Sequence, residues 1–327
     1  MAHALAETNG KVAMMYTGET PWHRLGTKLD EPATAREAIT AAGLNYRVAL
    51  KELVTKEDLP VPQRKAVVRN DTNQVLGVVG NGYVPIQNVE CFSFLDAVVS
   101  EGEVRYHTAG ALGKGERVWM LAKLPGHIRI NGTEDITDKY LLLSNSHNGK
   151  SALRVFFTPI RVVCANTLSI ATSGGRGQGI SILHKGDLGA KVREAQKVLG
   201  LAARFYDDVQ VKADYLARRY PTQHQLSQYF KQLFPDPDVG NKTRARNTRR
   251  RLHELFENGR GQDICGIRHT SWAAYNAVTE FVDHHRSTRA RTQGERDSRR
   301  LLSQWFGSGA RLNAQAWNMA LEMTGNN

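Results

Sequence analysis

The sequence predicts an α+β protein: an antiparallel β-sheet with hairpins covered by helices, followed by a basic, all-helical carboxy-terminal part. Short β-rich runs separated by glycine and polar turns fill much of residues 46–157. After Gly189 these runs disappear, and apolar residues recur at three- and four-residue steps, the period of an amphipathic helix. Hydrophobic residues make up 41% of the 327 positions, enough for a packed core. The chain therefore divides into an extended amino-terminal arm (1–31), an α+β core (32–188) and a basic helical region (189–327).

Strand and helix signals follow a definite order in the α+β core. Residues 34–42 predict a helix closed by Gly43, and residues 46–54 alternate as a strand does. The β-rich runs 65–70 and 74–79 flank a short polar turn and predict a hairpin. Residues 88–100 have helical spacing, with Asn88 as the N-cap. We expect further strands at 104–109, 117–124, 128–130, 139–145 and 152–157, the last interrupted by Pro159, and then a helix over 160–171.

Prolines and capping residues divide the helical region. Residues 190–220 predict a long amphipathic helix that Pro221 ends, and Thr222 caps a second helix that reaches residue 234. Further helices are expected at 241–257, 270–286, 298–306 and 312–323. The helix over 270–286 carries an aromatic stripe that, with Trp22 of the arm as an anchor, favours self-association into a ring or filament. The stripe consists of Trp272, Tyr275, Val278, Phe281 and Val282.

Composition sets the broad class of the protein. No run approaches the roughly 18 consecutive apolar residues that a membrane span needs, and the first residues lack a secretory signal pattern. Three cysteines far apart in the chain, Cys91, Cys164 and Cys265, fit neither a disulfide framework nor a cysteine-only zinc site. We therefore expect a cytoplasmic protein that makes no membrane contact.

The positive charge is unevenly distributed along the chain. Of the net charge of +12, residues 191–327 contribute +9, from 23 basic and 14 acidic side chains. Such asymmetry predicts a polyanionic partner for the carboxy-terminal part. The alternative is a basic protein whose charges are simply solvated.

The densest basic run lies in the helix expected at 241–257. Six basic residues occur within ten positions and no acid separates them, so several cations share one helix face and suit a phosphate backbone. The alternative is a solvated face neutralised by Glu254 and Glu257. The candidate nucleic-acid contacts are Lys242, Arg244, Arg246, Arg249, Arg250 and Arg251.

A second candidate surface lies in residues 144–168. A polar loop with Lys150 precedes a strand that carries Arg154 and two phenylalanines, and Arg161 follows on the expected helix. Basic and aromatic residues interleaved on a sheet suit single-stranded nucleic acid, because bases stack on aromatic rings. The alternative assigns the apolar residues to the core and the polar loop to a turn.

Signals for catalysis are weak. The glycine-rich runs 110–115 and 174–179 lack the context of a phosphate-binding loop, and Asp283-His284-His285 lacks a matching ligand cluster. Cys164 fits a small buried hydrophobe. We expect no catalytic residue, no metal and no cofactor, and therefore no enzyme.

Several segments carry a resemblance to a known family: Val68–Asp71, Leu76–Gly80, Tyr83, Ile86–Asn88, Phe157–Leu168 and Trp272–Glu280. They resemble the phage/plasmid-like protein family known as domain of unknown function 932, over nearly the whole chain. The resemblance implies that the protein belongs to a phage, plasmid or other mobile element, and it implies no particular activity. At the level of fold, a hairpin-rich sheet backed by a helix is also similar to phage single-strand-annealing recombinases.

Together these observations favour a non-enzymatic DNA-binding protein of a phage or mobile element, which binds single-stranded DNA and promotes annealing during recombination. Duplex DNA is a second partner, and the protein acts as a homo-oligomer. One alternative is a structural or regulatory protein whose basic helices bind an acidic protein partner. Another is a nuclease, although nuclease chemistry usually needs clustered acids for metal ions and the acids here are dispersed.

Overall fold

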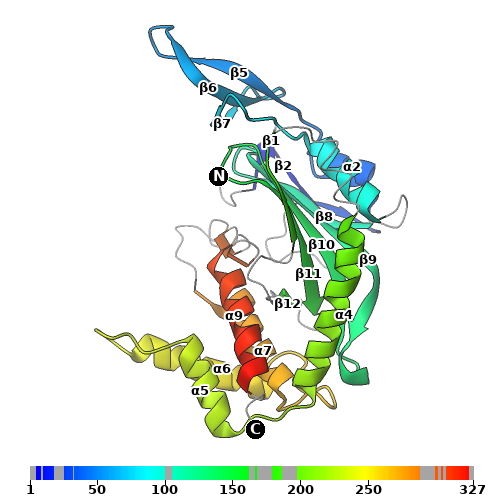
Figure 1. Ribbon diagram of the computed structural model, residues 1–327, viewed down its shortest axis with the longest axis vertical. Coiled ribbons are helices and arrows are strands. Elements are labelled where there is room, and N and C mark those ends of the chain that lie inside the picture. Colours follow the sequence, from blue (N-terminus) through cyan, green and yellow to red (C-terminus); the bar gives the residue numbers. More distant parts are fainter. Residues whose placement is uncertain are drawn as a thin grey trace.

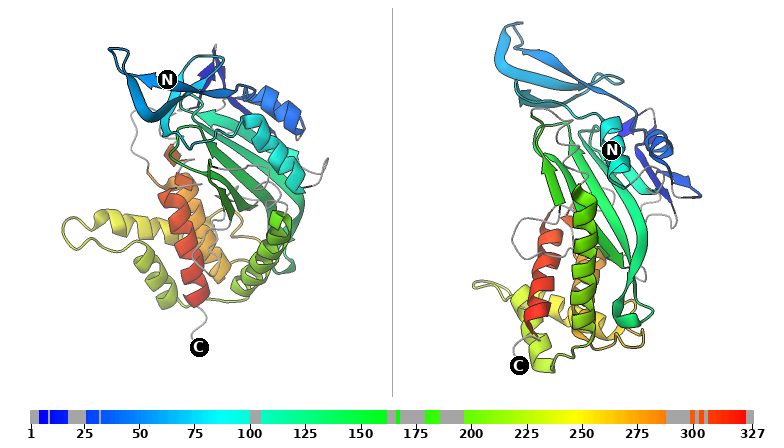
Figure 2. Two further views of the ribbon diagram at one scale, coloured as in Figure 1. Left: turned by 45° about the horizontal axis from the view of Figure 1, so that its top comes forward. Right: turned by 45° about the vertical axis from the view of Figure 1, so that its right-hand side comes forward.

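The computed structural model describes residues 5–8, 10–17, 26–31, 33–99, 105–161, 166–167, 179–185, 197–287, 299–300, 303–304 and 307–323. A large twisted sheet lies in the middle of an elongated molecule, a three-stranded sheet projects at one end, and a group of helices lies at the other (Figures 1 and 2). The predicted α+β class is confirmed. No described helix is both long and apolar enough to cross a bilayer.

The large sheet has the strand order β12-β11-β10-β9-β8-β3-β4, and β13 also pairs with β11. All of its pairings are antiparallel except that of β3 with β4. Its central strands are long and apolar on both faces. The strands are β3 (Met14–Thr17), β4 (Thr27–Leu29), β8 (Arg105–Leu112), β9 (Arg117–Arg129), β10 (Ile136–Ser146), β11 (Leu153–Arg161), β12 (Asn166–Thr167) and β13 (Gly179–Ile182), with a short 3₁₀ turn at Ile130–Gly132.

The predicted hairpin forms the projecting sheet of β5 (Val48–Val54), β6 (Pro60–Arg69) and β7 (Val75–Gly80). Gly77 allows this sheet to approach the turn between β10 and β11, since a Cβ there would lie 2.6 Å from the Cα of Asn148. Arg69 also joins it to the body: its guanidinium lies 3.8 Å from the Tyr46 ring centre and donates to the Lys114 carbonyl oxygen at 2.9 Å. A separate small hairpin pairs β1 (Glu7–Thr8) with β2 (Lys11–Val12).

The helices are α1 (Ala35–Ala41), α2 (Asn88–Val99), α4 (Lys197–Ala217), α5 (Gln223–Leu233), α6 (Thr243–Asn258), α7 (Ser271–Glu280) and α9 (Ser308–Met323). The predicted cap Thr222 is confirmed, and Thr34, expected as the first residue of a helix, is the N-cap of α1; each lies within a capping box. Gly43, with φ of 63°, follows α1 as expected. A π-helical turn, Phe281–His285, continues α7.

One cluster of buried apolar side chains crosses the boundary expected at residue 188. Phe157 of β11 stacks on Phe205 of α4 with ring centres 5.2 Å apart, and both belong to the cluster that also contains Trp272 and Trp317. The segment expected as an extended arm contributes the fully buried strand β3 to the large sheet. The sheet and the helices therefore share a single core.

The helix expected over 160–171 is wrong. Residues 160–161 end β11, and Asn166–Thr167 form β12, which pairs back on them; the rest of 162–171 lies outside the described residues. Isoleucine, valine and threonine in this segment are β-branched, which favours strands. β11 also continues through Pro159, which pairs with Lys139 of β10. Pro159 falls between the stretches paired with β13 (Leu153–Phe156) and β12 (Ile160–Arg161), so its missing N–H removes no ladder bond to those two strands.

Two finer expectations also need correction. Asn88 is the first residue of α2 and not its N-cap. Its side-chain Nδ2 donates to the Leu44 carbonyl oxygen at 3.0 Å, and its Oδ1 lies 2.9 Å from His147 Nε2. The strand expected at 128–130 is the end of the continuous strand β9.

Candidate nucleic-acid interface

The helix α6 has two halves of different character. Leu252, Leu255 and Phe256 are buried and anchor its second half on the core. Its first turn holds no acid, and Lys242, Arg246 and Arg250 follow one another at four-residue steps with exposed side chains. We call these three residues the α6 cationic row.

The charges at the start of α6, those of Lys242 and Arg244, oppose the local helix electrostatics. A helix amino terminus carries partial positive charge, so each cation there costs about 0.3–1 kcal/mol. The start of α1 instead carries the acid Glu37, and that of α5 carries a capping box closed by the neutral Gln225. The start of α6 has only the Asn241 Oδ1 atom, which accepts from the Thr243 backbone N–H at 2.7 Å. Folding alone gives no reason for cations at this place.

The other arginines of α6 differ in their surroundings. Arg249 donates to the Phe234 carbonyl oxygen at 2.7 Å and to Asp236 Oδ1 at 2.8 Å, so it fastens α6 to the end of α5. Arg251 forms an ion pair with Glu254 at 3.0 Å. The Arg244 Nη2 atom lies 3.4 Å from Ser287 Oγ beyond the end of α7.

The carboxylate of Asp236 is influenced by the charges of the cationic row. The hydrogen bond from Arg249 lowers the pKa of Asp236, and the charges of Lys242 and Arg246 add to this effect. Because Arg249 already occupies this carboxylate, the neighbouring cations gain only long-range attraction from it.

The three candidates near the sheet are spread along β11. Lys150 is exposed in the turn that precedes β11, and Arg154 is exposed on the strand opposite Ser144. Arg161 lies at the far end of β11, paired with Thr137 and Asn166, and not on a helix. The structure therefore does not bring these three residues together.

The phenylalanines between them do not form an exposed stacking surface. Phe157 is buried in the main core, and Phe156 is half-buried against a second apolar cluster that includes Trp119 and Leu142. These rings belong to the packing of the sheet, as the alternative interpretation holds.

Lys150 nevertheless lies beside a groove of about 380 Å³, because its neighbours Gly149 and Ser151 line that groove. Arg64 and Lys185 contribute positive charge to the lining, and Tyr83 stacks on His184 with ring centres 4.8 Å apart. Sequence inspection missed this groove because β7, the β10–β11 turn and residues 183–185 meet there only in the folded chain.

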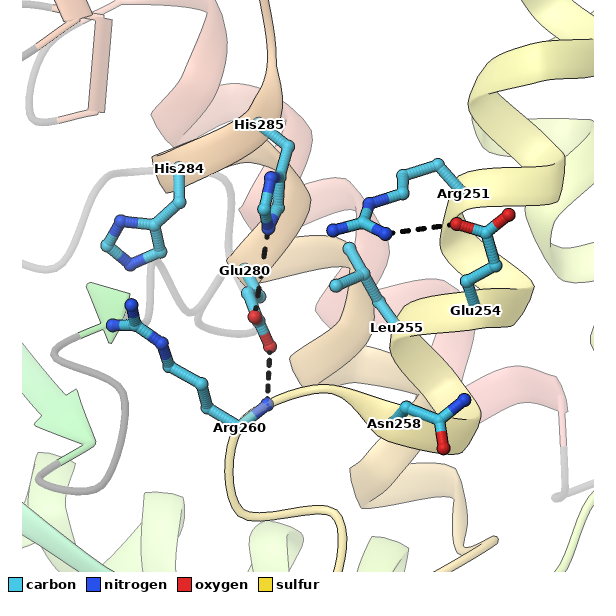
Figure 3. A pocket seen from close by; sticks show the side chains of 8 residues that line it. All are labelled: Arg251, Glu254, Leu255, Asn258, Arg260, Glu280, His284 and His285. Atoms are coloured by element: carbon cyan, nitrogen blue, oxygen red, sulfur yellow. Dashed lines mark hydrogen bonds and ion pairs between the residues drawn. The ribbon is translucent and has the colours of Figure 1, made fainter.

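A second cavity of about 360 Å³ lies between α6 and the end of α7 (Figure 3). The buried Glu280 carboxylate accepts from the Arg260 backbone N–H at 3.0 Å and lies 3.8 Å from His285 Nε2. Burial, followed by the nearby Arg251, lowers the pKa of His285. The two arginines of the lining are matched by Glu254 and Glu280, so the cavity is close to neutral.

The Asp283-His284-His285 sequence contributes to this region without forming a metal site. Asp283 is buried, whereas His284 and His285 both line the cavity of Figure 3. Within the described part of the chain, no group of three histidine, cysteine, aspartate or glutamate side chains is arranged to hold a metal ion. Cys164 and residues 174–178 of the glycine-rich run lie outside the described residues, and Gly179 begins β13.

Comparison with known protein families gives a match over most of the chain. No curated protein and no solved structure matches the chain. Residues 75–305 match the family described as Domain of unknown function (DUF932), a span that takes in both sheets in part, α6 and α7. The chain therefore belongs to the DUF932 family.

Proposed function

We propose that this protein is a non-enzymatic nucleic-acid-binding protein that holds a single strand by its phosphate backbone. The observation that carries the proposal is the α6 cationic row, in which Lys242, Arg246 and Arg250 are exposed along the first half of the helix. Cations spaced by one helical turn can each neutralise a phosphate, and release of the condensed counterions then drives binding.

The wider role proposed is strand annealing in a phage or mobile element. A backbone grip leaves the bases accessible for pairing, which annealing requires. The groove beside Lys150, with its stacked Tyr83 and His184 and the cations Arg64 and Lys185, offers a second contact for the strand. It lies at the end of the molecule opposite α6 (Figure 1), so one protomer would engage separate parts of a long strand.

The experiment is fluorescence anisotropy with a labelled single-stranded oligonucleotide at low salt. We expect the combined change Lys242→Ala, Arg246→Ala, Arg250→Ala to weaken binding at least about tenfold, because each lost phosphate contact removes counterion release. The matched control removes one lysine and two arginines from exposed positions elsewhere: Lys56→Ala, Arg36→Ala, Arg268→Ala. Equal weakening in both variants would mean that only net charge matters and would contradict a site on α6.

Annealing is tested separately, with two complementary oligonucleotides and a fluorescence-quenching readout. The wild-type protein should accelerate pairing, and the α6 variant should not. A protein that binds neither oligonucleotide but binds an acidic protein would instead support the interaction-protein alternative.

A further inference from the structure

A third cavity, of about 330 Å³, lies where the residues that follow α7, residues 299–300 and 303, and the first residue of α9 meet. Of the described residues that line it, none is acidic. The polar lining consists of Arg286, Ser287, Arg299, Arg300, Ser303 and Ser308.

Neutral oxygen atoms hold two of the guanidinium groups of this cavity. Arg286 Nη1 donates to Ser308 Oγ at 3.3 Å, and Arg300 Nη2 lies 3.5 Å from the Arg286 carbonyl oxygen. Among the described residues, the buried Arg300 Nε atom has no hydrogen-bond partner. A buried donor without an acceptor is costly, so this atom calls for an acceptor that the lining does not supply.

Positive charge also accumulates around the cavity. Helix α9 is 16 residues long and begins at Ser308, so the positive end of its dipole lies at the cavity. Arg244 reaches the rim through its contact with Ser287 at 3.4 Å. Burial, followed by the charge of Arg244, lowers the pKa of Arg286. Like charges gathered in a half-buried place repel one another unless an anion lies between them.

We propose that this cavity binds one phosphate group, held by Arg286 and Arg300 with Ser308 at the start of α9. Guanidinium groups donate in a fork that matches the oxygens of a phosphate, and serine hydroxyls add neutral donors. The cavity of Figure 3 provides a contrast within the same molecule, because Glu254 and Glu280 already balance its arginines.

Two kinds of ligand could supply this phosphate group: a free or terminal phosphate monoester, or a phosphodiester of a nucleic-acid backbone. Only the backbone phosphodiester rests on the proposed function. Arg244 lies between the α6 cationic row and this cavity, so a strand that follows α6 could place one of its phosphates here.

The test measures thermal stabilisation of the full chain by inorganic phosphate, against sodium chloride at equal ionic strength. Phosphate should raise the melting temperature of the wild type beyond chloride. Arg300→Gln and Arg286→Gln, made separately, should each weaken the apparent phosphate affinity at least about tenfold. Arg311→Gln is the control, an exposed arginine on α9 that does not line the cavity.

Oligonucleotides then identify the source. If a 5′-phosphorylated strand binds more tightly than its 5′-hydroxyl form and Arg300→Gln removes the difference, the site takes a terminal phosphate. If the two forms bind alike and Arg300→Gln lowers the salt slope by about 0.7, the site takes a backbone phosphate.

Failure of all strand binding with the phosphate effect intact would overturn only the proposed function. Phosphate stabilisation no greater than that of chloride, or unchanged in both cavity variants, would overturn this inference.

Discussion

Arg249 and Arg250 are adjacent in the sequence but have different surroundings. Arg249 bonds to Phe234 and Asp236, whereas Arg250 is exposed. We predict that Arg249→Ala lowers the free energy of unfolding by about 1–2 kcal/mol, since it removes a partly shielded, charge-assisted contact between α5 and α6. Arg250→Ala should cost less than about 0.5 kcal/mol, as exposed substitutions usually do. Urea denaturation of both variants measures the difference, and equal losses would refute the assignment.

His147 is a buried histidine at the end of the sheet. Because the Asn88 amide donates through Nδ2 to Leu44, its Oδ1 must accept, so His147 Nε2 carries a hydrogen. Burial, followed by the charges of His184 and Arg69, lowers the pKa of His147 to about 3. As the pH falls, the ring therefore takes up a proton at a higher pH in the unfolded chain than in the folded protein.

This difference predicts a pH dependence of stability. Between the ordinary histidine pKa near 6.5 and the folded value of about 3, the unfolded state binds the extra proton, so stability is lost as pH falls through this range. The slope from this single site is at most about 1.4 kcal/mol per pH unit. Urea denaturation at several pH values should show a shallower slope for His147→Gln than for the wild type. His224→Gln, at an exposed position, is the control, and an unchanged slope in His147→Gln would contradict the prediction.

At the scale of elements, one hydroxyl fixes α4 on the large sheet. Tyr206 Oη accepts from the Tyr140 backbone N–H at 2.9 Å and donates to its carbonyl oxygen at 2.6 Å, beside an irregularity in the pairing of β9 and β10. We predict that Tyr206→Phe lowers the free energy of unfolding by about 1–3 kcal/mol, because it leaves both backbone groups buried without partners. Tyr220→Phe, at a residue that is 66% exposed, should have no measurable effect. Thermal melts compare the two, and a neutral Tyr206→Phe would contradict this role.

Helices could be predicted from the sequence more accurately than strands, because helix ends carry local signals whereas strands depend on tertiary pairing. Helices marked by local signals, such as Thr222 before α5, were predicted almost to the residue. The segment 160–171 failed because its strands depend on pairing of residues 160–161 with 166–167, a tertiary contact that apolar spacing does not reveal. The expected interruption at Pro159 is wrong for the same reason: whether a proline interrupts a strand depends on which strand lies beside it in the sheet.

The candidate sites show the same division. The exposed cations of α6 could be predicted because a dense run of basic residues with helical spacing is visible in the linear sequence. The pairing of Arg249 could not be predicted, since Asp236 reaches Arg249 only through the turn after α5. The ion pair of Arg251 with Glu254, three residues on, agrees with the alternative that the sequence offered. The phosphate cavity joins residues from 286 to 308 through a fold that the linear spacing does not encode.

At the scale of the whole molecule, the sheet and the helical region should unfold together. Trp272 Nε1 of α7 donates to the buried Asp135 carboxylate at 2.8 Å, just before β10, and Phe205 packs on Phe157. We predict that tryptophan fluorescence and far-ultraviolet circular dichroism follow the same urea transition, because neither part keeps its core without the other. Two separate transitions would instead favour independent domains on either side of residue 188.

The aromatic stripe of α7 bears on assembly. Trp272, Tyr275 and Val278 are fully buried, and Trp272 and Tyr275 contact Trp317 of α9 within the same chain. The stripe is therefore core and gives no argument for self-association. Formation of a ring or filament stays a prediction that would need another surface.

The salt dependence of strand binding tests the central proposal most directly. If about five phosphates are neutralised, the logarithm of the affinity of the wild-type protein for a single-stranded oligonucleotide should fall against the logarithm of salt with a slope near −3.5. The Lys242→Ala, Arg246→Ala, Arg250→Ala variant should give a slope shallower by about 2, because three contacts are lost. The Lys56→Ala, Arg36→Ala, Arg268→Ala control should keep the wild-type slope. A wild-type affinity that does not change with salt, or equal slopes for the wild type and the α6 variant, would contradict the account.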